Sequence, residues 1–197
     1  LQELKCEDKA FPRAELEAAG YRAVFNGQKT YNGVAILSRH EPVDVQRDIP
    51  GFADEQKRVI AATLDGVRIV CGYFPNGQAV GSEKFAYKLQ WLAALTGWLR
   101  GEIARHPALV LAGDFNIAPE DRDVHDPEAW RGQVLFHPKE HAALRRLLAW
   151  GLVDLLREKH PEIYAVLLRS AGASGRLLRL EGSGRILVEQ AAGLAQA

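Results

Sequence analysis

Two polar side chains follow a short apolar run near the middle of the chain. Residues 108–112 lie in the stretch ALVLAGDFNIAPEDRDVHD between Pro107 and Gly113, and this run indicates a buried strand because a helix would need about 10 residues. Asp114 and Asn116 come next at alternate positions of an extended segment, so their side chains point the same way. A carboxylate and an amide are therefore predicted to leave together at a strand's carboxyl end, where open α/β sheets place their ligands.

An Asx-turn is the alternative interpretation of Asp114 and Asn116. Both residue types commonly hydrogen-bond their own backbone after a strand, with no further role. Pro119 and the acidic residues that follow it are expected to prevent an immediate return to regular structure. On this stretch alone, the two interpretations carry equal weight.

Composition limits the classes of protein that this chain can be. Its 197 residues predict one domain or slightly more, with enough length for a sizeable core. The chain has 25 basic and 25 acidic residues, so no overall field draws it to nucleic acid or membrane, although a local basic groove is compatible with this balance. Cys6 and Cys71 suit neither a disulfide framework nor a zinc site, which favours a reduced, cytoplasmic location. No apolar run reaches the ~18 residues of a membrane span.

Turn and cap residues predict the elements around this stretch. The clearest hairpin is residues 57–73, where two β-rich runs flank Asp65-Gly66, a pair that suits a two-residue turn with positive φ. Residues 82–105 are predicted to form a long helix that packs one apolar face on a sheet. Further helices are expected at 12–20 and 138–150, and further strands at 21–28 and 31–39.

The two ends of the chain differ from the rest. The chain contains no methionine and starts at Leu1, so we expect a piece of a longer protein whose beginning is missing. We divide it into residues 1–164 and a divergent tail, residues 165–197, which is dominated by Leu, Ala, Gly and Arg. The only strand-like piece of the tail is RILVE, residues 185–189. The tail is interpreted either as a genuine amphipathic or disordered segment or, preferably, as the product of a shifted reading frame.

Five segments within residues 1–164 form a recognisable series. They are LQELKCEDKAFP, YNGVAILSR, GYFPNGQAVGSEKFAYKLQWLAAL, LAGDFNIAPEDRDVHDPEAWRGQVLFHPKE and GLVDLLRE. Together they closely resemble the exodeoxyribonuclease III family, the abasic-site endonucleases and 3′-phosphodiesterases of the wider endonuclease/exonuclease/phosphatase superfamily. The resemblance implies an α/β (α+β) fold, a four-layer αββα sandwich of two mixed sheets face to face with helices outside. It also implies that this sandwich is incomplete at both ends, without the first strand and the C-terminal catalytic segment.

The resemblance assigns roles to four residues. Glu3 matches the glutamate that binds the divalent metal, Mg²⁺ or Mn²⁺, and Tyr73 matches the active-site tyrosine at the phosphate. Asp114 matches the residue that orients or deprotonates water, and Asn116 matches a donor to the phosphate. A hard cation held by carboxylates stabilises charge on phosphate oxygens, while neutral donors hold the phosphate without adding negative charge. None of the six histidines lies in a matching context, so no catalytic histidine is assigned.

The implied function is metal-dependent hydrolysis of phosphodiester bonds in double-stranded DNA, at abasic sites and 3′ ends, by a monomer without membrane contact. The resembled family also has a WN-x-N motif in its first strand, and RID and SDH motifs in its C-terminal catalytic segment. Because these motifs are missing here, we expect the 197-residue chain to fold poorly and to be nearly inactive. One alternative is a non-catalytic remnant that still binds DNA or a partner. Another is a phosphodiesterase of a different branch that acts on lipid or inositol phosphates.

Overall fold

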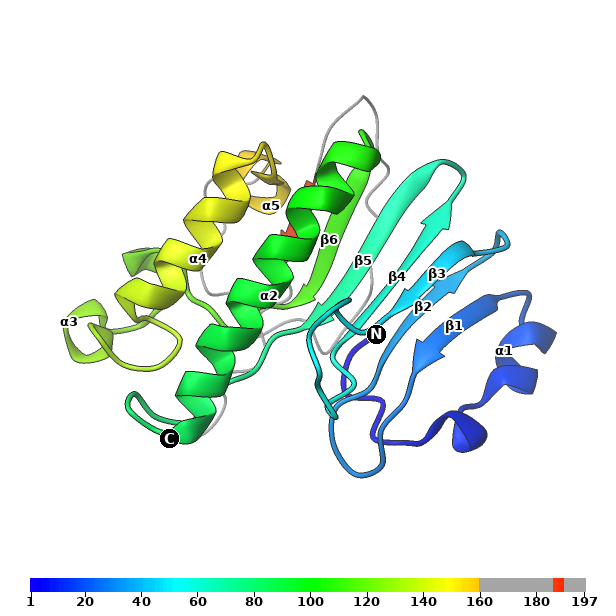
Figure 1. Cartoon of the computed structure of the whole chain (residues 1–197), viewed down its shortest axis with the longest axis horizontal. Helices are drawn as coiled ribbons and strands as arrows, with labels where there is room; N and C mark the ends of the chain where they lie inside the picture. Colours follow the sequence, from blue (N-terminus) through cyan, green and yellow to red (C-terminus); the bar gives the residue numbers. More distant parts are fainter. Residues whose placement is uncertain (160–185, 190–197) are drawn as a thin grey trace.

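The computed structural model describes residues 1–159 and 186–189 (Figure 1). The strands are β1 Arg22–Asn26, β2 Val34–Ser38, β3 Val43–Arg47, β4 Val59–Leu64, β5 Val67–Tyr73, β6 Leu109–Asp114, β7 Val153–Asp154 and β8 Ile186–Glu189. The helices are α1 Arg13–Ala18, α2 Glu83–Arg105, α3 Pro127–Trp130, α4 Pro138–Ala149 and α5 Leu155–Lys159. Two 3-10 helices, η1 Asp8–Ala10 and η2 Asp121–Asp123, complete the described elements.

The strands form a large mixed sheet and a small antiparallel one. The large sheet has six strands in the order β3-β4-β5-β6-β8-β7, and the small sheet pairs β1 with β2. Strands β3, β4 and β5 run antiparallel, whereas β5, β6, β8 and β7 run parallel. The parallel step from β5 to β6 requires a crossover, and the long helix α2 supplies it.

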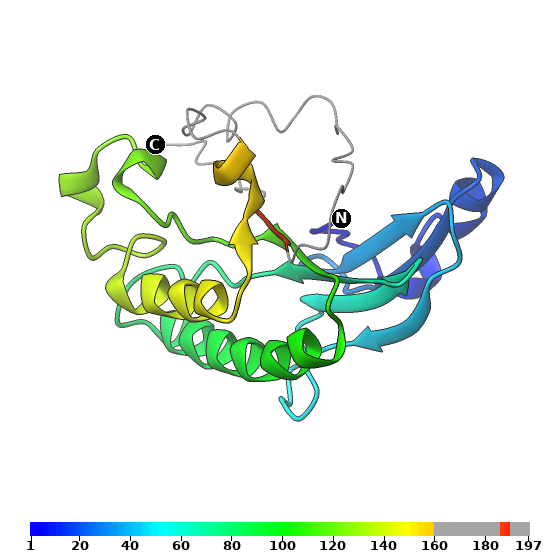
Figure 2. The ribbon, with the colours of Figure 1, turned by 90° about the horizontal axis from the view of Figure 1, so that it is seen from above.

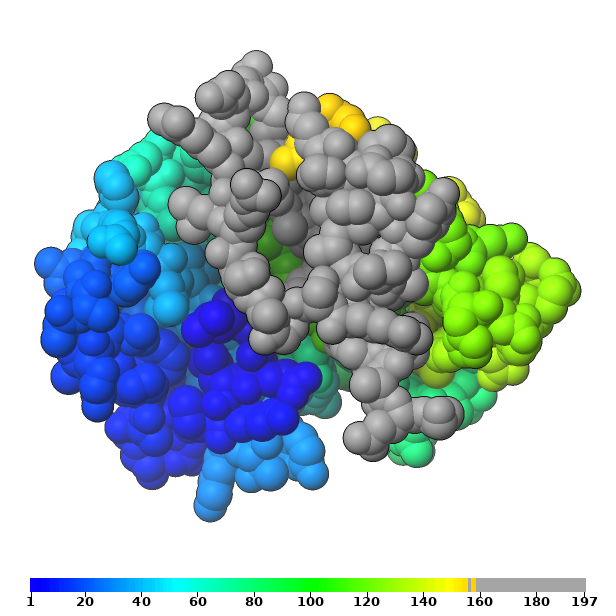
Figure 3. Space-filling view, turned by 180° about the vertical axis from the view of Figure 1, so that it is seen from behind, coloured from blue at the N-terminus to red at the C-terminus, as the bar shows by residue number. Residues whose placement is uncertain are grey.

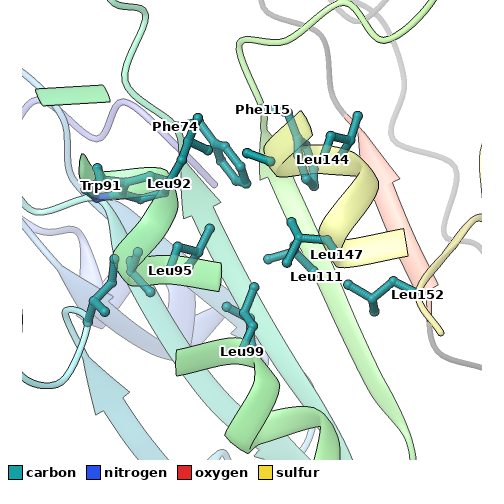
Figure 4. Close-up of a cluster of buried hydrophobic side chains, with 14 of the residues drawn as sticks. Phe74, Trp91, Leu92, Leu95, Leu99, Leu111, Phe115, Leu144, Leu147 and Leu152 are labelled. Carbon is teal, nitrogen blue, oxygen red and sulfur yellow. The ribbon is translucent and has the colours of Figure 1, made fainter. Parts of the chain in front are cut away.

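Helices α2 and α4 lie side by side on one face of the large sheet (Figure 2). Their apolar faces meet residues of β4, β5 and β6 in what we call the helix-facing core (Figure 4). Its buried members include Val59, Ala61, Val70, Phe74, Trp91, Leu92, Leu95, Leu99, Leu109, Leu111, Phe115, Leu144 and Leu147.

The small sheet packs on the opposite face of the large sheet. We call this second contact the sheet-facing core; its buried residues are Val34, Ile36, Ile60, Ala62 and Cys71. Helix α1 packs outside β1, so the order of layers is helices, large sheet, small sheet, helix. The first residues of the chain lie on the surface of the face shown in Figure 3. The predicted αββα sandwich is therefore confirmed.

The sequence predictions for the main elements are confirmed with shifts of a few residues. The hairpin β4–β5 turns at Asp65 and Gly66, whose φ angles of 48° and 80° match a two-residue turn with positive φ at both positions. Helix α2 starts at the predicted cap, since the Ser82 side chain accepts a hydrogen bond from the amide of Phe85. The described residues of the strand-like piece, Ile186–Glu189, form β8.

The chain stays irregular over residues 115–120 after β6, as predicted, before η2 covers Asp121–Asp123 and Asp126 caps α3 at Pro127. Strand β3 was not predicted from the sequence. Asp44 has a φ of 51° and the register shifts between Val43 and Gln46, so the side chains lack the regular alternation by which a strand is recognised. The boundary at residue 164 and the rest of the tail lie outside the described residues. Within the described part, no helix is long and apolar enough to cross a membrane.

Candidate active site

Strands β5 and β6 carry the predicted residues to the same edge of the sheet. Their parallel register pairs Tyr73 with Asp114, and Gly72 with Gly113. A Cβ atom at Gly113, where φ is 148°, would lie 1.8 Å from the carbonyl oxygen of Gly72. Glycine at position 113 therefore allows the two strands to approach at the point where the polar side chains begin.

Asp114 and Asn116 are joined to each other, as the Asx-turn interpretation requires. The backbone amide of Asn116 donates to Oδ1 of Asp114 at 3.0 Å, and Nδ2 of Asn116 donates to Oδ2 at 3.2 Å. Nδ2 also donates to the carbonyl oxygen of Phe74, at 2.9 Å, which ties this turn to the loop after β5. The two interpretations of the sequence are thus compatible, since the turn places the carboxylate and the amide side by side.

Glu3 reaches the same edge from the N-terminal segment. Gln2 forms a bridge with Val34, and Leu4 donates to the carbonyl oxygen of Gly33, so this segment lies along the start of β2. The hydroxyl group of Tyr73 donates to Oε1 of Glu3 at 3.0 Å. The Glu3 carboxylate, predicted as the metal ligand, therefore contacts a residue 70 positions away in the sequence.

Burial and charge perturb both members of this contact. Tyr73 is half-buried, and its burial together with the charge of Glu3 raises the pKa of its hydroxyl from 10.0 to about 12. The pKa of Glu3 is lowered, first by its hydrogen bond with Lys5, whose Nζ lies 2.8 Å from Oε2. At neutral pH the pair therefore consists of a protonated phenol and an ionised carboxylate.

The sequence analysis missed two residues in contact with this group. The guanidinium of Arg58 lies 4.8 Å from the centre of the Tyr73 ring, and its Nη1 donates to the Tyr73 carbonyl oxygen at 3.0 Å. Nδ2 of Asn76 lies 3.4 Å from Oδ1 of Asn116. Asn76 is in the YFPNG stretch, which offered a signal; Arg58 comes immediately before β4 and offered none.

The histidines of the described part lie outside this group. His40 pairs with Asp65 in the hairpin turn, His106 approaches Glu102, and His125 contacts Trp130. His137 caps α4, and Nε2 of His141 lies 2.8 Å from the carbonyl oxygen of Ala118. His160 is outside the described residues.

The donor set suits a divalent cation only in part. Among the described residues, no cluster of three or more His, Cys, Asp or Glu side chains could hold a metal ion. Glu3 offers one partly exposed carboxylate, with Lys5 and Tyr73 on its two oxygens. Mg²⁺ is typically held by one or two carboxylates together with waters and substrate phosphates, so Glu3 fits the role of one such ligand after Lys5 moves away.

Comparison with known proteins identifies the family. The profile of the Endonuclease/Exonuclease/phosphatase family matches residues 1–168, and the chain belongs to this family. It is 36% identical over 173 residues to exodeoxyribonuclease III of Haemophilus influenzae, covering 82% of this chain and 65% of that protein.

Two solved structures resemble the fold closely. One is the 3′ phosphatase NExo from Neisseria, bound to a product DNA hairpin, with 51% identity and a TM-score of 0.81. The other is an AP endonuclease from Archaeoglobus fulgidus, with 38% identity and a TM-score of 0.77. Each match covers 82% of this chain and 63% of the other chain. The chain thus spans a little under two thirds of the length of these relatives.

Proposed function

We propose that this chain contributes the active site of a DNA-repair phosphodiesterase that hydrolyses phosphodiester bonds of double-stranded DNA at abasic sites and 3′ ends. The observation that carries the proposal is the meeting of Glu3, Tyr73 and the Asp114–Asn116 pair at one sheet edge, from two different sheets. The names of its relatives support a DNA substrate. We also propose that the protein acts as a monomer in the cytoplasm.

Each residue of the site has a chemical task in this proposal. Because its pKa is raised to about 12, Tyr73 is protonated at neutral pH and acts as a neutral donor to a phosphate oxygen. Asp114 is the carboxylate that orients or deprotonates the attacking water. Asn116 is the donor to the phosphate; because both protons of its Nδ2 are used in the contacts with Asp114 and Phe74, it releases one of these acceptors when the phosphate binds. Glu3 would hold Mg²⁺ or Mn²⁺, and such a cation stabilises the charge that develops on the phosphate oxygens.

The test is cleavage of a duplex that carries a single synthetic abasic site, with Mg²⁺ and with EDTA. Because the chain is expected to be nearly inactive, we expect weak Mg²⁺-dependent cleavage, which falls by a further factor of about 10² to 10⁴ in Asp114→Asn. Asp65→Asn is the matched control, because it makes the same change in an exposed turn whose positive φ suits asparagine. Cleavage that is equal in both variants would refute the assignment of Asp114.

Two other results would replace the proposal. DNA binding that survives both EDTA and Asp114→Ala, with no cleavage by any variant, would indicate a non-catalytic binding protein. Turnover of a lipid or inositol phosphate with none on DNA would move the substrate to another class.

A further inference from the structure

Lys88 lies on the apolar stripe of α2, in the same row as Phe85, Leu92, Leu95 and Leu99. Its side chain is 0% exposed, and so is that of its partner Glu140 on α4. A buried charge without a partner is strongly unfavourable, so this position requires a specific set of contacts. Because no part of Lys88 is exposed, it can affect a substrate only through the groups that it contacts.

The ammonium group of Lys88 binds the backbone of both loops that form the candidate active site. Nζ donates to the carbonyl oxygen of Asn116 at 2.6 Å and to that of Asn76 at 3.1 Å. These are the same two residues whose side chains meet at 3.4 Å. Lys88 therefore joins the loop after β5 to the loop after β6 at the two residues whose side chains are in contact.

Glu140 fixes the position of the ammonium group. It forms an ion pair with Lys88, and it accepts hydrogen bonds from the backbone amides of Leu135 and His137 at 3.3 and 3.0 Å. The carboxylate is therefore anchored to the start of α4 whether or not the lysine is present. The ammonium group thus contacts both loops and the Glu140 carboxylate of α4, and these contacts together fix its position.

Asn116 is the residue most dependent on this contact. Its φ of 47° lies in the left-handed region, where asparagine is enriched, and its partly buried carbonyl oxygen accepts from the Lys88 ammonium group. The same conformation directs its side-chain amide at Oδ2 of Asp114 and at the carbonyl oxygen of Phe74. A shift of this peptide group would move the amide and the carboxylate that depends on it.

We propose that Lys88, held by Glu140, is a positioning residue for the reaction: it fixes the Asn76 and Asn116 peptide groups and thereby the geometry of the Asp114–Asn116 pair. Its kinetic consequence rests on the function proposed above. Its structural consequence, a fixed Asn116 side chain, does not.

The test replaces the ion pair by two uncharged residues, Lys88→Met with Glu140→Gln. Removing both charges avoids an unpaired buried ion, so we expect a Tm near that of the parent chain. The side-chain amide protons of Asn116 should then exchange with solvent on the order of 10-fold faster, measured by NMR. For a parent chain that cleaves abasic DNA, kcat should fall about 10- to 100-fold with KM little changed, because the reacting groups are misplaced while the DNA contacts remain.

The matched control is a second buried ion pair on the same helix. Arg68 and Glu102, which are 5% and 3% exposed, lie at the opposite end of α2 and of β5, away from both loops. Arg68→Met with Glu102→Gln also removes both charges, so Tm should again stay near that of the parent chain, and the Asn116 exchange rate and kcat should keep their parental values. A purely structural role for Lys88 predicts that both pairs of substitutions act alike.

A conservative variant keeps the proposal open to refutation if the uncharged pair unfolds. Lys88→Arg retains the charge and several donors, so it should preserve slow exchange at Asn116. Parental exchange in the folded Lys88→Met/Glu140→Gln protein, or fast exchange in a folded Lys88→Arg protein, would overturn the proposal. Failure of the parent chain to cleave DNA or to bind Mg²⁺ would instead refute the proposed function, and the exchange comparison would still decide the role of Lys88.

Discussion

The surroundings of Tyr73 favour the protonated form of its phenol. Burial and the neighbouring Glu3 carboxylate both penalise the phenolate, which explains the rise of its pKa from 10.0 to about 12. A raised folded-state pKa contributes stability that is fully present below the unfolded value and is lost as pH rises through the folded value. For Tyr73 that window lies between pH 10 and 12.

Tyr73→Phe should remove one titration from this window. We expect the loss of a tyrosinate absorbance change centred near pH 12 and a shallower decline of stability with pH above 10. Part of the decline should remain, because burial and Asp54 also raise the pKa of Tyr87. Ultraviolet difference titration of the two proteins checks the assignment, and Tyr31→Phe, at a well exposed position, is the control.

In the proposed function, a metal ion held by Glu3 would compete with Lys5, whose Nζ lies 2.8 Å from Oε2 of Glu3. The Lys5–Glu3 pair is exposed, and such pairs are weak because water and salt screen their charges. Lys5→Met should therefore strengthen Mn²⁺ binding by roughly two- to five-fold, as measured by calorimetry. Lys9→Met removes a similar pair with Glu7 and should leave Mn²⁺ binding unchanged. Weaker Mn²⁺ binding in Lys5→Met would show that the lysine supports the site and does not compete for it.

The same substitution has a consequence at acid pH. The pKa of Glu3 is lowered from its usual value of 4.5, first by the hydrogen bond of Lys5. The stability that Glu3 contributes is present above pH 4.5 and is lost as pH falls through its folded-state pKa. Lys5→Met should reduce this acid dependence, which urea unfolding below pH 4.5 would measure.

At the scale of elements, the close approach of β5 and β6 depends on one glycine. A Cβ atom at Gly113 would overlap the carbonyl oxygen of Gly72, and neither strand is free to move away because both are buried. We expect Gly113→Ala to destabilise the fold by about 3 kcal/mol or more. Gly97→Ala on the exposed side of α2, with nothing within 4 Å, should stabilise it by about 0.5–1 kcal/mol. Chemical unfolding of both variants measures the contrast, and equal effects would contradict it.

The elements that the sequence predicts well have local signals. Asp65-Gly66 specifies the turn of the β4–β5 hairpin, and Ser82 with the apolar stripe specifies α2. Strand β3 has no such signal, because its irregular register against β4 hides the period of two that identifies a strand. Helix α3 is only four residues long, and its start depends on the hydrogen bond that the backbone amide of Ala129 donates to the Asp126 side chain.

Long-range contacts in the site could not be predicted from spacing. Asp114 and Asn116 are two residues apart, and their alternation predicted that they act together. Glu3 and Tyr73 are brought together by strand pairing and by layer packing, so only the family resemblance connected them. The buried pairing of Lys88 with Glu140 was not predicted from the sequence, because a lysine or glutamate on a helix is most often exposed to solvent.

At the scale of the whole molecule, the candidate active site is assembled from two sheets. Glu3 is placed by the small sheet, whereas Tyr73 and Asp114 end strands of the large sheet. The hydrogen bond between Glu3 and Tyr73 therefore depends on the packing of the sheet-facing core.

A cavity in the sheet-facing core should be detectable at Tyr73. Ile36→Ala removes buried methyl groups between the sheets, and we expect the pKa of Tyr73 to fall from about 12 toward 10.0. Leu99→Ala is the control, because it makes a cavity of similar size in the helix-facing core. It should cost about 2–5 kcal/mol of stability and leave the Tyr73 titration in place. Identical titrations in the two variants would show that the layers do not control the contact.

The β4–β5 hairpin contributes alternate residues to both cores. Val59 and Ala61 face the helices, whereas Ile60 and Ala62 face the small sheet. Slippage of β4 by one residue would exchange these two sets and misfit both cores at once. A shifted register would therefore be unfavourable on both faces of the sheet. The correct register in turn fixes the position of Tyr73 at the end of β5.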